Sequence, residues 1–326
     1  MPINESNKQL LESYGITLKK ELKGSSVLQL NGFNKDTKIS KSLYEVLLSA
    51  LSKADTKKHI DLPDITFGIE FEFVGSYLSK DLSEFNKEMS RLLHDKYIYL
   101  GEYTHNDGDC YILGRDGSIR YRNSYLPQPF GYELSTPKLN FNSEDDIATL
   151  SKVISLIEKH LKGYVNQSCG THIHIGFKSD NVVAGSVRNT LSAYNCMEKR
   201  VFDTIVPTSR RRNKYCKPTS IYLHNKYQKL SSRFCEFNYN GSCKKLHFEF
   251  RQLEGTLNLN LILNWARLQS YILYDLLTNA SDTAYLSSVT RKNIFEILTY
   301  YDLDPKLISF FIARVISFRS RALQSS

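Results

Sequence analysis

Short stretches of alternating apolar and polar residues recur between longer segments of helical periodicity. Alternation is typical of a strand with one buried face, whereas apolar residues three and four positions apart are typical of an amphipathic helix. Alternation predicts strands over Ile65–Val74, Lys96–Tyr103, Cys110–Arg115, Phe130–Ser135, Thr171–Phe177 and Leu246–Leu253. Helical spacing predicts helices over Ser42–Ala54, Asp81–His94, Glu144–Leu161, Val182–Ile205, Leu257–Leu277, Ile294–Tyr300 and Pro305–Phe318. Strands scattered between helices, often polar on one face, indicate an α+β fold with a mostly antiparallel sheet and helices on its other face.

The first 60 residues differ from the rest of the chain. They contain a polar start, a hairpin predicted around Val27–Gly32 with a tight turn at Asn31-Gly32, and one amphipathic helix. A lysine-rich stretch and Asp61-Leu62-Pro63-Asp64 follow, which is a composition typical of a domain boundary. We therefore predict an N-terminal extension over residues 1–60, of unknown role, and a catalytic domain over residues 61–326.

The strand predicted at Ile65–Val74 carries two acidic residues on one face. Residues two apart on a strand point to the same side, with Cα atoms roughly 6–7 Å apart. Glu70 and Glu72 therefore share the face opposite Ile69 and Phe71. Two carboxylates so close repel each other unless a cation, a basic side chain or water compensates. A solvated strand face would also satisfy this motif when it is taken alone.

The same pattern recurs in three further predicted strands. Glu133, the pair His172 and His174, and Glu249 each lie on the polar face of an alternating segment. Four strands that present carboxylate or imidazole on one face are hard to explain as independent accidents. Oxygen ligands with one imidazole suit Mg²⁺ or Mn²⁺ better than Zn²⁺. The pattern therefore predicts a metal site on the sheet.

Positive charge is distributed along the chain and dense at one place. The formal net charge is +9, and the segment from Arg210 to Lys217 holds five basic residues. Residues 207–241 are basic and aromatic with weak periodicity, which is typical of a long active-site loop. An anionic partner is indicated. We favour a local phosphate site over general nucleic-acid binding, because most of the charge is dispersed.

Compartment and partners follow from composition. The six cysteines form no CxxC pair, the start MPINESNKQL has no apolar core, and no apolar run reaches membrane-spanning length. We expect a cytoplasmic protein with reduced cysteines and no membrane partner. The composition is compatible with either a monomer or a homo-oligomer.

Five short motifs, in order, resemble those of the amidoligase family, whose members are distant relatives of glutamine synthetase and glutamate–cysteine ligase. The motifs are Gly68-Ile69-Glu70-Phe71-Glu72, Asp116-Gly117-Ser118-Ile119, Gly131-Tyr132-Glu133-Leu134-Ser135-Thr136-Pro137, Cys169-Gly170-Thr171-His172-Ile173-His174, and Phe248-Glu249-Phe250-Arg251 with Gly255-Thr256-Leu257. The resemblance spans about residues 65–270. It implies a glutamine-synthetase-like curved sheet, mostly antiparallel, with helices on its outer face and metal on its inner face.

The resemblance also implies metal ligands. Glu72 and Glu133 would hold the metal nearer the acceptor carboxylate. Glu70, His172 and Glu249 would hold the metal that binds the ATP phosphates.

Other roles follow from the same resemblance. His174 would lie near ATP, and Arg251 would contact the transferring phosphate. Asp116 belongs to the family's Asp-Gly-Ser motif, either as a metal ligand or as a residue that orders the loop. One of Arg210, Arg211 and Arg212 would stabilise the phosphoryl group.

The implied activity is an ATP- and Mg²⁺- (or Mn²⁺-) dependent carboxylate–amine ligase that forms an amide or isopeptide bond through an acyl phosphate and releases ADP. Its partners would be ATP with a small carboxylate and amine, or a peptide. Three alternatives remain: a metal-dependent phosphohydrolase or nuclease, a nucleic-acid-binding protein, and an ATP-consuming kinase or peptide ligase of the same fold.

Overall fold

The chain forms two compact units in the computed structural model. The residues described are 5–30, 36–52, 57–60, 65–100, 109–122, 124–177, 184–211, 213–217, 237–239 and 246–324. Unit 1 comprises Met1–Asp61, Ser192–Pro207 and Asp275–Ser326, and unit 2 comprises Leu62–Leu191 and Thr208–Tyr274. The expected division into 1–60 and 61–326 stays a prediction, and the C-terminal helices group with the first 61 residues.

Unit 2 is a mixed α+β structure built on one large sheet. The hydrogen-bonded strand order is β10-β11-β9-β4-β7-β6-β5, and β8 pairs with β4. Among the described pairs, β5 and β6 run parallel and the others run antiparallel. The strands are β4 (Ile65–Ser76), β5 (Tyr97–Tyr99), β6 (Tyr111–Arg115), β7 (Pro129–Ser135), β8 (Leu139–Asn140), β9 (Gly170–Phe177), β10 (Phe237–Tyr239) and β11 (Leu246–Glu254).

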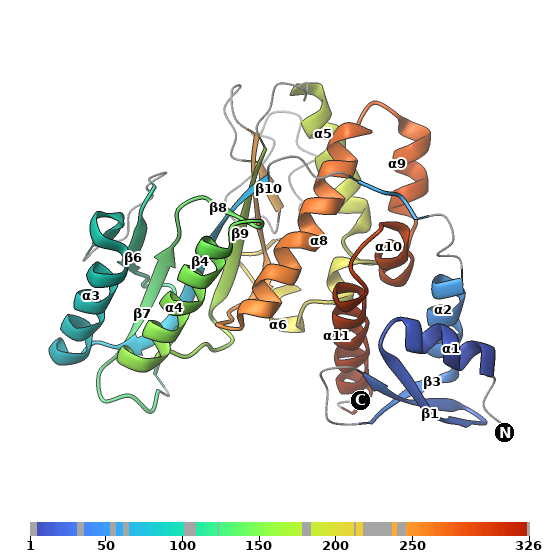
Figure 1. Cartoon of the computed structure of the whole chain (residues 1–326), viewed down its shortest axis with the longest axis horizontal. Helices are drawn as coiled ribbons and strands as arrows, with labels where there is room; N and C mark the ends of the chain where they lie inside the picture. Colours follow the sequence, from blue (N-terminus) through green and yellow to red (C-terminus); the bar gives the residue numbers. More distant parts are fainter. Residues whose placement is uncertain are drawn as a thin grey trace. The chain divides into compact units, whose positions relative to one another are not determined.

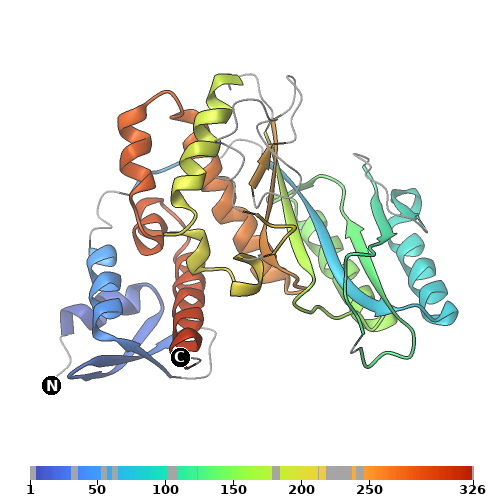
Figure 2. The ribbon, with the colours of Figure 1, turned by 180° about the vertical axis from the view of Figure 1, so that it is seen from behind.

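Helices cover one face of this sheet. They are α3 (Ser79–Leu93), α4 (Glu144–His160) and α8 (Leu259–Thr278), which lie in front of the sheet in Figure 1 and behind it in Figure 2. Shorter elements of unit 2 are the 3₁₀ turn η2 (His94–Lys96) and α6 (Thr208–Arg211). Helix α4 begins as its sequence predicts, because the Ser143 side chain accepts a hydrogen bond from the Asp146 backbone N–H at 3.1 Å.

Alternation along β4 separates the core from the polar face. Its apolar side chains toward the helices, from Ile65 to Phe73, are each 4% exposed or less. Period-two geometry then directs Glu70 and Glu72 to the face without these helices. The cross-strand pairs on that polar face are Glu72–Glu133, Glu70–His172 and His174–Glu249. The four acid- or histidine-bearing strands are consecutive in the sheet, as β11, β9, β4 and β7.

Unit 1 joins both ends of the chain. Its elements are α1 (Glu5–Ser13), a three-stranded sheet of β1 (Ile16–Leu22), β2 (Ser25–Leu30) and β3 (Thr37–Ser40), α2 (Lys41–Ser52), the 3₁₀ turn η3 (Phe202–Thr204), α9 (Thr283–Thr290), α10 (Ile294–Tyr300) and α11 (Pro305–Gln324). Two helices belong to both units. Helix α5 (Ala184–Met197) begins in unit 2 and ends in unit 1, and α8 also begins in unit 2 and ends in unit 1. The β2–β3 pairing fits the predicted hairpin, whereas its turn at Asn31-Gly32 lies outside the described residues.

A buried polar cluster holds residues 57–60 in unit 1. Asp275 is fully buried, and its carboxylate pairs with the Lys58 ammonium at 2.6 Å. The same carboxylate accepts hydrogen bonds from the hydroxyls of Tyr285, at 2.6 Å, and Tyr301, at 2.9 Å. A backbone bridge joins Lys58 to Tyr301 as well. Residues 57–60, which precede β4 in the chain, are thus fixed to the C-terminal helices of unit 1.

One predicted helix is shorter than expected. Spacing predicted it over Val182–Ile205, but α5 ends at Met197. The rings of Tyr194 and Phe202 stack at 4.2 Å, whereas residues eight apart in a straight helix are about 12 Å apart along its axis. Burial of this stacked pair therefore overrides helical periodicity. Among the described residues, no helix is both long and apolar enough to cross a membrane.

Candidate active site

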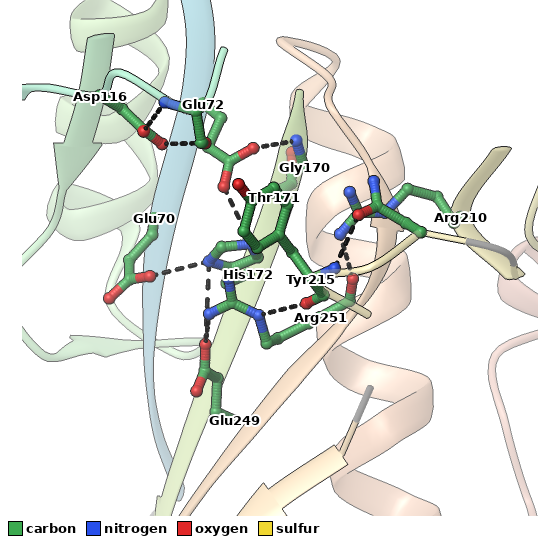
Figure 3. Close-up of polar contacts among 12 residues, drawn as sticks. Glu70, Glu72, Asp116, Gly170, Thr171, His172, Arg210, Tyr215, Glu249 and Arg251 are labelled. Carbon is green, nitrogen blue, oxygen red and sulfur yellow. Dashed lines mark hydrogen bonds and ion pairs between the residues drawn. The ribbon is translucent and has the colours of Figure 1, made fainter. Parts of the chain in front are cut away.

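Two groups of potential metal ligands meet on the polar face of the large sheet. Glu70, His172 and Glu249 form one group, and Glu72, Glu133 and His172 form the other. Within each group one ligand atom per residue lies within 4.8 Å of the others. Figure 3 shows His172 in the middle, with Glu70, Glu72 and Glu249 around it. The structure therefore brings together the five residues that the family resemblance assigned to two metal sites.

His172 contacts three carboxylates with its two nitrogens. Its Nδ1 lies 2.8 Å from Glu70 Oε2 and 3.8 Å from Glu249 Oε1. Its Nε2 lies 3.2 Å from Glu72 Oε1, which is an ion-pair distance, but the alignment of a hydrogen bond is missing and this buried nitrogen has no hydrogen-bond partner. The other Glu72 oxygen, Oε2, accepts a hydrogen bond from the Gly170 N–H at 2.6 Å.

The crowded carboxylates titrate differently. Burial and the charges of Glu70 and Glu72 raise the pKa of Glu133 well above its ordinary value. Burial would also raise the pKa of Glu72, but the positive charges of His172, Arg210 and Arg251 lower it to about 2. One carboxyl group therefore takes up a proton easily, while its neighbour stays ionised.

The surrounding carboxylates raise the pKa of both His172 and His174. Burial and the Arg251 charge act to lower the pKa of His172, but Glu72 and Glu70 outweigh them and raise it. Burial likewise opposes protonation of His174, and the Glu70 carboxylate again raises the pKa. Without metal, protonated imidazoles balance part of the negative charge. A metal ion would have to displace the proton of a ligating His172.

Arginines supply the remaining positive charge. The Arg251 guanidinium pairs through Nη1 with Glu249 Oε1, and its Nε donates to the Tyr215 carbonyl at 3.1 Å. Burial acts to lower the pKa of Arg251, but the Glu249 and Glu70 carboxylates raise it further above its ordinary value. Arg210 donates through Nη2 to the Arg251 carbonyl.

Burial distinguishes two of the three adjacent arginines. Arg210 is 2% exposed and reaches the site from α6, whereas Arg211 is partly exposed. Arg212 lies outside the described residues, as does most of the predicted loop at 218–236. Sequence alone could not separate Arg210 from Arg211, because the difference depends on a four-residue helix, α6, in which Arg210 is buried.

Asp116 lies outside both ligand groups. Its Oδ1 accepts a hydrogen bond from the Ser118 N–H at 2.7 Å, and its Oδ2 accepts one from the Ser118 hydroxyl at 3.0 Å. The Asp116 N–H donates to the carbonyl of Gly131 at 2.9 Å, on the strand that also carries Glu133. In this arrangement Asp116 orders the loop, and its role as a metal ligand stays a prediction.

His174 meets a residue that was not nominated. Its Nδ1 lies 2.8 Å from His247 Nε2, and its Nε2 lies 3.2 Å from Glu70 Oε1. The alternation of His247, Glu249 and Arg251 was the available signal for His247. The backbone partners of this site, the Gly170 N–H and the Tyr215 carbonyl, leave no side-chain pattern that could have predicted them.

The residues present fit divalent cations. Bonds of about 2.0–2.6 Å to a hard cation allow ligand atoms to lie up to about 5 Å apart across it, and both groups satisfy that limit. Carboxylates with one imidazole match Mg²⁺ or Mn²⁺. The buried His172 Nε2 without a hydrogen-bond partner is the kind of atom that a metal would satisfy.

Comparison with known proteins gives one family. A family model described as "Putative amidoligase enzyme" matches residues 63–233, slightly more than half of the chain. The motif around Glu249 and Arg251 lies beyond the matched residues. A search of curated proteins gives no match.

Two solved structures to which this chain is similar both have low TM-scores. One is PafA, the ligase of the prokaryotic ubiquitin-like protein Pup, in complex with Pup, with a TM-score of 0.32 and 11% identity over 83% of this chain and 65% of that chain. This chain thus spans just under two thirds of the PafA chain. Another is the class II 3-hydroxy-3-methylglutaryl-CoA reductase from Streptococcus pneumoniae, with a TM-score of 0.19 and 10% identity over 97% of this chain and 94% of that chain. At these scores neither supports a conclusion about fold or function.

Proposed function

Since the chain belongs to the putative amidoligase family, we propose that it is an ATP-dependent carboxylate–amine ligase that uses Mg²⁺ or Mn²⁺ and releases ADP. The acceptor carboxylate would be phosphorylated by ATP, and an amine would then displace phosphate to form an amide or isopeptide bond. A glutamine-synthetase-like architecture, with the reaction on the polar face of the large sheet, belongs to this proposal.

One observation carries the proposal. Four consecutive strands bring carboxylates and His172 into two adjoining ligand groups, with the buried Arg210 and the largely buried Arg251 beside them. Phosphoryl transfer depends mainly on positioning and charge neutralisation. A buried face with this many carboxylates is costly unless cations bind it, which favours a site for metal and phosphate over a structural role.

Each residue has a task in this scheme. Glu70, His172 and Glu249 would hold one divalent cation, and Glu72 with Glu133 would hold the other. When bound, these cations would neutralise phosphate charge and orient the reacting carboxylate.

The basic residues would act on the nucleotide side. Arg251 and Arg210 would face the phosphoryl group during transfer, because the guanidinium groups of the largely buried Arg251 and the buried Arg210 lie beside the two ligand groups. His174, on the same strand as His172, would contact ATP. The attacking amine loses a proton, and a carboxylate of the polar face would accept it.

Hydroxylamine trapping tests the proposal without knowledge of the amine. The protein would be incubated with ATP, Mg²⁺, hydroxylamine and pooled amino acids, small carboxylic acids and peptides. An acyl phosphate would be captured as a hydroxamate, detectable by mass spectrometry, together with an equal amount of ADP. Glu249→Gln, which keeps the side-chain shape and removes a ligand charge, is the matched control and should form neither.

Other outcomes exclude the proposal. AMP and pyrophosphate as products would rule out an acyl phosphate. ADP formation without hydroxamate, under every acceptor pool, would indicate a phosphohydrolase instead.

A further inference from the structure

Gly170, at the start of β9, separates Glu72 from the guanidinium of Arg210 (Figure 3). We propose that Gly170 is a positioning residue: it leaves the space in which the Arg210 guanidinium rests, and so fixes this cation beside the ligand groups. The inference rests on the proposed function for its catalytic consequence, whereas the placement of Arg210 can be tested without any turnover.

Arg210 lies against the backbone of Gly170. A Cβ atom added at Gly170 would lie 2.7 Å from Arg210 Nη2, 2.9 Å from Nη1 and 3.0 Å from Cζ. Both terminal nitrogens and the central carbon of the guanidinium lie within 3.0 Å of this position, so the end of the arginine side chain is packed against it. Any larger side chain would occupy the space of the guanidinium.

Backbone conformation does not explain the glycine. Among the described glycines, only Gly15 has a positive φ. Gly170 therefore has a backbone conformation that residues other than glycine also adopt. The requirement for glycine therefore comes from space. A glycine at a close approach of another group is one of the few reasons for glycine within a strand.

The backbone around Gly170 is held in place on both sides. Its N–H donates to Glu72 Oε2 at 2.6 Å. The preceding carbonyl, of Cys169, accepts from the Gly255 N–H at 3.0 Å, and the hydroxyl of Thr171 accepts from the Thr256 N–H at 3.0 Å. With the backbone fixed, an added Cβ would displace the end of the arginine side chain and leave the strand in place.

Arg210 is also poised for an anion. It is almost fully buried and donates to the Arg251 carbonyl, while its buried Nε has no hydrogen-bond partner. A buried guanidinium with an unused donor is costly. A phosphoryl oxygen would satisfy it, provided that the guanidinium keeps its place on Gly170.

Gly170→Ala separates this role from metal binding. The Gly170 N–H remains in the variant, so Glu72 keeps its partner and Mn²⁺ affinity should stay at the wild-type value. Arg210 should move, and its reaction with phenylglyoxal, followed by peptide mass spectrometry, should increase. Gly24→Ala is the control, because a Cβ added there meets no atom within 4 Å.

A double-mutant cycle measures the catalytic coupling. If Gly170 acts through Arg210, Gly170→Ala and Arg210→Ala should each lower kcat, on the order of 10²-fold for a buried charge donor, and the double variant should equal Arg210→Ala alone. Multiplied losses in the double variant, or unchanged phenylglyoxal labelling in Gly170→Ala, would overturn the inference. A wild-type protein with no ligase activity would refute the proposed function, and the labelling result alone would then decide the placement of Arg210.

Discussion

Glu133→Gln should make the metal-free protein more stable at neutral pH. Glu133 is 7% exposed and lies opposite Glu72 in the sheet, with Glu70 near by. Burial and these two charges raise the pKa of Glu133 well above its ordinary value of 4.5. Gln has the same shape but cannot acquire the charge that this site disfavours.

The sign and magnitude follow from linkage. Below pH 4.5 the Glu133 carboxyl is protonated in both folded and unfolded chains, so the group leaves stability unchanged. Between 4.5 and the raised folded pKa, only the folded protein holds the proton, and the wild type loses about 1.4 kcal/mol of unfolding free energy per pH unit from this group. The advantage of the Gln variant should therefore grow at that rate through this window and stay constant above it.

Urea unfolding across pH, with and without Mg²⁺, provides the assay. Saturating metal stabilises a folded protein by about 2.7 kcal/mol at a hundredfold excess over its Kd. Because Glu133→Gln lacks one ligand, Mg²⁺ should stabilise the variant less than the wild type. The difference in unfolding free energy between the two proteins should therefore narrow or change sign when Mg²⁺ is added. A Gln variant less stable than wild type at every pH in metal-free buffer would show that Glu133 is structural.

Three further variants test other parts of the account. His172→Ala should steeply raise the Mg²⁺ or Mn²⁺ concentration needed for turnover, whereas His174→Ala should mainly raise the KM for ATP; equal metal dependence with unchanged KM in both would make the pair structural. Arg210→Lys should lower kcat on the order of 10²-fold, because a flexible ammonium does not replace a planar guanidinium. Arg211→Lys should change kcat far less. A larger loss of kcat in Arg211→Lys than in Arg210→Lys would contradict the assignment of Arg210. Asp275→Ala leaves a lysine ammonium and two tyrosine hydroxyls without their shared acceptor. Chemical denaturation should show an unfolding free energy lower by about 3–5 kcal/mol. A loss below about 1 kcal/mol would contradict the stabilising role of that cluster.

Period-two alternation explains why much of the large sheet could be predicted. Each acid or histidine on the polar face alternates with a buried apolar residue, so its direction follows from the strand alone. The strand order could not be predicted, because pairing of β9 with both β4 and β11 depends on contacts distant in sequence. The same limit applies to α5, where the Tyr194–Phe202 stack ends a helix that periodicity would continue.

For the site, side-chain chemistry was predictable and backbone chemistry was not. Five of the six candidate metal ligands, all except Asp116, come together because they share one face of four consecutive strands. The difference between Arg210 and Arg211 depends on the face of α6 that is buried and on the space at Gly170, neither of which leaves a local pattern. Asp116 matched a motif, yet its carboxylate is directed to Ser118 within its own loop.

The central claim is that the polar face binds two divalent cations for phosphoryl transfer. Anomalous diffraction from crystals grown with Mn²⁺ and ADP tests this claim most directly. We predict one Mn²⁺ peak among Glu70, His172 and Glu249, and a second between Glu72 and Glu133. Ordered ADP with no Mn²⁺ at these carboxylates would contradict the account.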